Sequence, residues 1–226
     1  MINLIEYTLL AFGLSLILVP ACRSLARRFG FVAKPRMDRW HGRPTALLGG
    51  VAIAITVLGL HIALLGFSGA PAILAAGVVI FAIGLTDDIV SLKPVTKLVF
   101  EIAAASMLAF LNYRLGWVES LTLDTILTLF WIVGFTNAFN LLDNMDGLCA
   151  GLSVISGVGV LAGLWLSGAR GPEVTHLALL IGAAAGFLVY NFKWLWAWVG
   201  DGVRLPILGR LGQRVSWLLF AGILVI

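Results

Sequence analysis

The sequence predicts an all-α fold: a polytopic membrane helix bundle of seven to eight transmembrane helices, with the N-terminus outside. Hydrophobic residues make up 61% of the 226 residues and charged residues only 12%, whereas a soluble domain carries roughly 25% charged residues. The mean hydropathy is +1.05, and the apolar residues gather in runs near the ~20 residues that a helix needs to cross a bilayer. We therefore expect one integral membrane domain over residues 1–226.

Seven apolar runs predict the helices in order. We expect them at 4–22, 46–65, 69–86, 95–111, 121–139, 148–166 and 176–192. A last apolar run extends from Val215 to the end of the chain and holds only 12 residues, fewer than the roughly 20 that span comfortably. An eighth span would need residues before Val215, or the chain is a fragment.

The basic residues between these runs predict the orientation. Of the 15 Lys and Arg residues, all except Arg114 and Arg170 fall on one side of the predicted helices. Because basic loops stay in the cytoplasm, we expect the loops 23–45, 87–94 and 140–147 and the segment 193–214 there, in an inner (plasma) membrane protein. The net charge of +4 is accounted for in this way. No basic run is interleaved with aromatic residues, so we expect no nucleic-acid partner.

Two polar residues and several glycines inside the predicted helices allow further predictions. Glu101 lies in the cytoplasmic half of the fourth helix, where a carboxylate is costly and indicates a cavity, a partner or a functional site. His61 is expected to be a buried packing residue of the second helix. Glycines in the last two helices are typical of close helix packing; they are Gly157, Gly159, Gly182 and Gly186.

Three cytoplasmic loops bring aspartates to one membrane surface. Asp87 and Asp88 follow the third helix, Asp143 and Asp146 follow the fifth, and Asp201 stands between two glycines after the seventh. Each motif alone could be a solvated loop, a helix cap or a turn. Together, and beside basic loops, they suit Mg²⁺, which uses one or two carboxylates with waters and substrate phosphates. This combination indicates phosphoryl transfer.

Four motifs in this order resemble the polyprenyl-phosphate N-acetylhexosamine-1-phosphate transferases, over roughly residues 30–210. The first is Lys34-Pro35-Arg36-Met37-Asp38-Arg39-Trp40-His41-Gly42-Arg43-Pro44-Thr45, leading to Gly49-Gly50. The second is Gly84-Leu85-Thr86-Asp87-Asp88 with Lys93-Pro94 and Lys97. The third runs from Asn137-Ala138-Phe139-Asn140 through Asp143 and Asp146 to Gly147-Leu148. The fourth is Asn191 followed by Gly200-Asp201.

The resemblance implies roles for the matching positions. Asp87 and Asp88 would be catalytic, and Asp87 would deprotonate or orient the lipid phosphate. Asp201 and Asp88 would hold Mg²⁺, with Mn²⁺ as an alternative. The residues implied to bind substrate are Arg39, His41, Arg43, Lys97, Asn137, Asn140, Asp143, Asp146 and Asn191.

The function that the resemblance implies is transfer of N-acetylhexosamine-1-phosphate from a UDP-sugar to polyprenyl (undecaprenyl) phosphate, with release of UMP, for cell-envelope glycans. The first loop favours a plain GlcNAc-type sugar over a peptide-bearing one. The active site would face the cytoplasm. Direct attack and a covalent aspartyl intermediate both stay open, and so does a homodimer.

The chain also departs from the family. Val203-Arg204 follow Gly202 where Gly-Ser is usual, Asn144 stands where Gly is common, and the chain ends before the family's late helices and His-rich cytoplasmic loop. One alternative is therefore a truncated, non-catalytic relative that binds lipid phosphate or a partner. Another is a transporter that uses Glu101 in an ion path, which predicts interrupted helices at mid-membrane.

Overall fold

A computed structural model describes residues 2–30, 32–33, 45–46, 49–67, 71–90, 92–143 and 147–191. The chain divides into two compact units, Met1–Tyr190 and Asn191–Ile226. All but the first residue of the second unit lies outside the described part, and with it the apolar run from Val215. The fold below is that of the first unit.

Seven helices make up almost all of the described chain, so the all-α prediction is confirmed. They are α1 (Ile2–Phe29), α2 (Gly49–Leu65), α3 (Pro71–Val90), α4 (Pro94–Phe110), α5 (Leu121–Leu142), α6 (Leu148–Leu166) and α7 (Pro172–Asn191). The sequence did not predict the one antiparallel pair of strands, β1 (Val32–Ala33) and β2 (Thr45–Ala46), in which Val32 faces Ala46.

The helices begin and end where local chemistry favours it. Pro94 is at the first turn of α4, where a missing N–H costs nothing and the fixed φ suits the helix. Ser120 caps α5 by accepting a hydrogen bond from the Leu123 N–H. Gly66 and Gly168 follow α2 and α6 with φ of +68° and +80°, the left-handed conformation that stops a helix at little cost for glycine.

Several of these helices continue past the predicted ends into segments that carry polar and charged residues. The sequence placed Asp87, Asp88 and Asn140 in loops, but α3 continues to Val90 and α5 to Leu142. Those loop assignments are wrong, because a polar side chain ends the apolar run without ending the backbone hydrogen bonding of the helix. The acidic and amide residues consequently project from the last turns of helices.

The chain is a multi-pass membrane protein. Five described helices are long and apolar enough to cross a membrane: α1, α3, α5, α6 and α7. The helix α2 is apolar but has 17 residues. Large apolar side chains such as Ile17, Phe130 and Ile155 are mostly exposed, which suits contact with lipid chains rather than with water.

Small residues let α1 and α7 approach each other closely. A Cβ added at Gly182 would collide with the Thr8 carbonyl oxygen, and one at Gly186 would lie 2.7 Å from the Phe12 carbonyl oxygen. The predicted role of these two glycines in close packing is confirmed. On α6, a Cβ at Gly157 would lie 2.8 Å from the Ile181 side chain, which confirms this position too, while Gly159 faces open space.

Hydrogen bonds between side chains and backbone add to this α1–α7 contact. The Ser15 hydroxyl donates to the Ala183 carbonyl at 2.8 Å, and the Tyr190 hydroxyl donates to the Leu16 carbonyl at 3.0 Å. Between α2 and α7, His61 is buried with its Nδ1 3.1 Å from Nδ1 of His176. His61 is thus a packing residue, as the sequence predicts.

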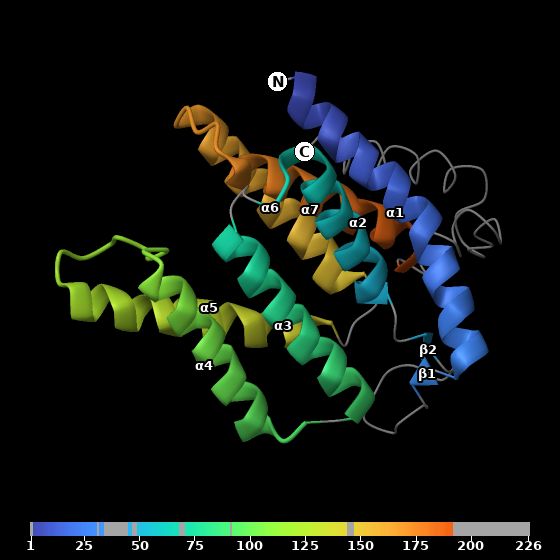
Figure 1. Cartoon of the computed structure of the whole chain (residues 1–226), viewed down its shortest axis with the longest axis horizontal. Coiled ribbons are helices and arrows are strands. Elements are labelled where there is room, and N and C mark those ends of the chain that lie inside the picture. The colour runs from blue at the N-terminus through green and yellow to red at the C-terminus, as the bar shows by residue number, and fades with distance from the viewer. Residues whose placement is uncertain are drawn as a thin grey trace, which may run out of the picture. The chain divides into compact units, whose positions relative to one another are not determined.

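The helices α3, α4 and α5 pack in sequence order, α3 against α4 and α4 against α5 (Figure 1). Because each helix reverses the direction of the one before it, the end of α3, the start of α4 and the end of α5 lie at the same end of the group. Asp87, Lys97, Asn140 and Asp143 all belong to these helix ends. The fold thereby gathers candidate residues that lie up to about fifty positions apart in the sequence.

Candidate active site

Asp87 ties the end of α3 to the start of α4. Its Oδ1 accepts a hydrogen bond from the Leu92 N–H at 2.9 Å, and its Oδ2 lies 3.2 Å from Nζ of Lys97. Both charged side chains are partly shielded, with 26% of the Asp87 side chain and 13% of the Lys97 side chain exposed. A charge-assisted hydrogen bond of this kind is stronger than a neutral one. Two residues that the sequence predicted separately, as base and as substrate ligand, are therefore in direct contact.

Asp88 follows Asp87 in the last turn of α3 and is exposed. Consecutive residues of a helix do not face each other, so the two carboxylates leave α3 in different directions. Asp87 holds Lys97, and the Asp88 carboxylate lies on another side of this helix end.

Glu101 lies one helical turn further along α4 than Lys97 and is only 3% exposed. Its Oε2 accepts a hydrogen bond from Nδ2 of Asn137 on α5, whereas none of the described residues forms a hydrogen bond with its buried Oε1. The sequence predicted a cavity, a partner or a functional site for Glu101, and the structure confirms the cavity, described next, and the partner.

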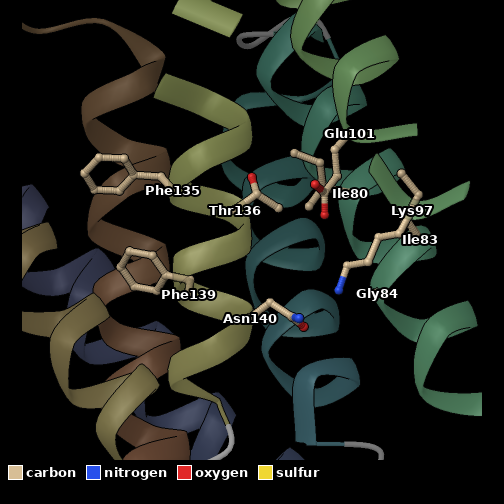
Figure 2. A pocket seen from close by; sticks show the side chains of 9 residues that line it. All are labelled: Ile80, Ile83, Gly84, Lys97, Glu101, Phe135, Thr136, Phe139 and Asn140. Atoms are coloured by element: carbon tan, nitrogen blue, oxygen red, sulfur yellow. The ribbon is translucent and has the colours of Figure 1, made fainter. Parts of the chain in front are cut away.

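A cavity of about 410 Å³ lies between α3, α4 and α5. Figure 2 shows the side chains of Lys97, Glu101 and Asn140 on its wall, with the Lys97 ammonium group on the same side as Asn140. The rest of the wall is largely apolar: Ile80, Ile83, Gly84, Phe135, Thr136 and Phe139. Volume and lining are typical of a site for an organic ligand that is mostly apolar with a few fixed polar groups.

The α5 residues of the predicted site occupy two faces of its last turns. Asn140 lies one turn beyond Thr136, and both line the cavity. Asp143 is the C-cap of α5 and is exposed. Its partner in the predicted motif, Asp146, lies outside the described residues. Gly147 follows with a φ of +76° and begins α6, so the chain turns sharply immediately after this acidic segment.

The other predicted site residues are not among those that the structure brings together at the ends of α3, α4 and α5. Arg39, His41, Arg43 and Asp201 lie outside the described residues. Asn191 is the last residue of α7 and falls in the second unit. Within the described segments, no three His, Cys, Asp or Glu side chains form a cluster that could hold a metal ion.

Sequence reasoning missed the apolar wall of the cavity. Phe135 and Phe139 are four residues apart, as are Thr136 and Asn140 and also Lys97 and Glu101. Residues at this spacing share a helix face, so the periodicity could have indicated a common lining. In a membrane helix the signal is weak, because apolar residues occupy every face.

Comparisons with known proteins identify the relatives of this chain. The model of glycosyl transferase family 4 matches residues 70–207, a range that includes the whole α3–α4–α5 group. A probable undecaprenyl-phosphate N-acetylglucosaminyl 1-phosphate transferase of Bacillus subtilis is 32% identical in an alignment that covers 91% of this chain and 62% of that protein.

Two further relatives have related names. A decaprenyl-phosphate N-acetylglucosaminephosphotransferase of Mycobacterium tuberculosis is 35% identical over 79% of this chain and 51% of its own length. A phospho-N-acetylmuramoyl-pentapeptide-transferase of Limosilactobacillus reuteri is 34% identical over 66% of this chain and 51% of its own length. The chain thus spans about half to two thirds of the length of these relatives.

Proposed function

Because the chain belongs to glycosyl transferase family 4, we propose that it transfers N-acetylhexosamine-1-phosphate from a UDP-sugar to a polyprenyl phosphate and releases UMP. The observation that carries the proposal is the Asp87–Lys97 ion pair beside a largely apolar cavity at the helix ends. A lipid phosphate needs charged groups for its head and apolar space for its chain. The α3–α4–α5 group offers both side by side, because Lys97 belongs to the ion pair and also lines the cavity.

In the proposed reaction, an oxygen of the lipid phosphate attacks the β-phosphorus of the UDP-sugar. The bond between this phosphorus and the bridging oxygen breaks, and UMP leaves with that oxygen. Asp87 accepts the proton of a protonated lipid phosphate or orients its oxygen, and the Lys97 ammonium group offsets the negative charge that gathers there. The product is a polyprenyl diphosphate sugar.

We also propose that Mg²⁺ takes part and that Asp88 and Asp201 hold it. Mg²⁺ binds proteins through one or two carboxylates and completes its shell with waters and phosphate oxygens, and both residues carry this type of donor. When bound, the ion would screen the charge between the two phosphates and stabilise the leaving UMP.

We further propose that the site faces the cytoplasm of a cell with a polyprenyl-linked envelope glycan, with the N-terminus outside. The sugar we favour is N-acetylglucosamine, because relatives named for it match at 32–36% identity over more of this chain than the pentapeptide transferases do. A transporter is less favoured, because the described helices are continuous, whereas ion sites of transporters use interrupted helices at mid-membrane.

The test is UMP release by the purified full chain in detergent, from UDP-N-acetylglucosamine, with and without undecaprenyl phosphate and Mg²⁺. We expect release that needs both, and that an Asp201→Ala variant loses. Chelation of Mg²⁺ should abolish release and added Mn²⁺ should restore part of it. Binding of undecaprenyl phosphate without UMP release from any UDP-sugar would instead support a non-catalytic, lipid-binding relative.

A further inference from the structure

The side-chain amide of Asn137 is held by two acceptors. Its Nδ2 donates to the Val133 carbonyl oxygen at 3.0 Å and to Oε2 of Glu101. A side-chain amide has two N–H groups and one carbonyl oxygen, so both of its donors are in use. The reverse orientation would set the Asn137 carbonyl oxygen against two other oxygens, and the surroundings therefore fix which way the amide faces.

Glu101 is the residue that completes this arrangement. The bond to Val133 lies within α5 and occupies one N–H group only, whereas Glu101 comes from α4 and occupies the second. Glu101 is almost fully buried at 3% exposure, so water competes little for its Oε2. A buried carboxylate is costly, and no salt bridge of the described residues compensates Glu101. Such a cost points to a purpose other than stability.

We propose that Glu101 is a positioning residue that makes Asn137 present its carbonyl oxygen, and never an N–H group, to the substrates. The inference rests on the proposed function for the location of the ligands. The described part of the chain supplies no donor to Oδ1 of Asn137, and the side chain is exposed. Asn137 stands on α5 between Thr136 and Asn140, which both line the cavity.

The orientation decides which ligand groups Asn137 can contact. A carbonyl oxygen binds a hard cation or an N–H or O–H group, and it repels phosphate oxygens. Polyprenyl phosphate offers at most one P–OH donor, which the proposed function directs to Asp87, whereas the UDP-sugar carries hydroxyl and amide N–H groups and would bind together with Mg²⁺. Asn137 therefore serves the nucleotide-sugar and its metal ion, and the lipid phosphate is left to Lys97.

Two variants of Glu101 separate positioning from packing. Glu101→Leu removes the acceptor but keeps an apolar filling between α4 and α5, while Glu101→Gln keeps a carbonyl acceptor at the same place. We expect Glu101→Leu to raise either the KM for UDP-N-acetylglucosamine or the half-saturating Mg²⁺ concentration about tenfold, a loss of ~1.4 kcal/mol. The KM for undecaprenyl phosphate should change less than about twofold. Titrating the sugar nucleotide and Mg²⁺ separately shows whether Asn137 contacts the nucleotide-sugar or the metal ion.

Glu101→Gln should keep most of the affinity for UDP-N-acetylglucosamine or Mg²⁺ that Glu101→Leu loses. The control is Val99→Ala, at a side chain that is 58% exposed, and it should match wild type. Asn137→Ala should reproduce the Glu101→Leu shift, and the double variant should be no worse than Asn137→Ala, because residues that act as a unit are not additive. The proposal would be overturned if the effects of the two single variants multiplied in the double variant, or if only the KM for undecaprenyl phosphate shifted.

A spectroscopic readout keeps the inference separate from the proposed function. In protein labelled with ¹⁵N-asparagine, both Asn137 side-chain protons should resonate downfield as hydrogen-bonded protons. One should move upfield in Glu101→Leu and stay in Glu101→Gln. If this pattern holds while wild type releases no UMP, the proposed function fails and the positioning by Glu101 stands. If Glu101→Leu leaves both resonances in place, the positioning is wrong whatever the activity.

Discussion

Asp87 and Lys97 form an ion pair that runs against the dipoles of both helices that carry it. Asp87 is in the last turn of α3 and Lys97 is in the first turn of α4, with 3.2 Å between Oδ2 and Nζ. An anion at a helix C-terminus and a cation at an N-terminus are each unfavourable by about 0.3–1 kcal/mol. An arrangement that opposes stability in this way favours a functional reason for the charges.

Exchanging the two charges tests that reason. The variant Asp87→Lys/Lys97→Asp keeps an ion pair and improves both dipole interactions, but it loses the bond from the Leu92 N–H. These effects nearly cancel, so the free energy of unfolding should change by less than about 1 kcal/mol. UMP release should nevertheless fall below detection. If the exchanged protein kept the turnover of wild type, the ion pair would serve only to hold α3 and α4 together.

The single variant Asp87→Asn isolates the carboxylate. The amide can still accept from Leu92, and a partly exposed ion pair contributes only ~0–1 kcal/mol, so the fold should persist. Turnover should fall at least 100-fold, the usual range for loss of a general acid or base. The matched control is Glu119→Gln, a carboxylate at the opposite helix ends, which should keep wild-type turnover. An equal loss in both variants would refute a specific role for Asp87.

The close contact of α1 and α7 predicts a stability effect at Gly182. Gly182→Ala places a methyl group against the Thr8 carbonyl oxygen and 2.9 Å from the Ala11 Cβ, so the helices must separate. We expect a loss of about 1–3 kcal/mol, typical of overpacking, seen as a lower unfolding temperature in detergent. Gly59→Ala on α2 is the control, because a Cβ there lies more than 4 Å from every neighbouring atom of the described residues. Equal unfolding temperatures for the two variants would mean that the contact is looser than described.

The proposed orientation can be measured with single cysteines. Lys93 precedes α4 and Glu119 precedes α5 at the opposite ends, and both are exposed. After replacement of Cys22 and Cys149 by alanine, a membrane-impermeant maleimide should label Glu119→Cys on intact cells and Lys93→Cys only after permeabilisation. The reverse pattern would place the N-terminus in the cytoplasm and contradict the positive-inside assignment.

The sequence predicted the helices well because lipid imposes a length and an apolar composition on each span. All seven predicted runs from residue 4 to residue 192 have a helix in the structure. The ends were less predictable. The runs stop at Asp87 and near Asn140, yet α3 and α5 continue, since a backbone hydrogen bond does not depend on the polarity of the side chain above it.

The site was predictable in its residue types but not in its pairings. A carboxylate inside a membrane helix is energetically costly, so the sequence indicated a cavity, a partner or a functional site at Glu101. It did not indicate which partner, because Asn137 is 36 residues away and on another helix. Which carboxylate would contact Lys97 depended on the α3–α4 turn, and the sequence predicted no contact of Lys97 with either Asp87 or Asp88. Contacts of this kind arise from helix packing, which depends on side-chain shape across helices and not on local pattern.

The most direct test of the proposed transfer follows the β-phosphorus of the donor. UDP-N-acetylglucosamine labelled with ³²P at the β-phosphate is incubated with the full chain, undecaprenyl phosphate and Mg²⁺, and the products are separated into lipid and water phases. We expect the label to enter the lipid phase, with equimolar unlabelled UMP in the water phase, for wild type and not for Asp87→Asn. Label that stays in water as UDP, with the sugar alone passing to lipid, would contradict sugar-1-phosphate transfer.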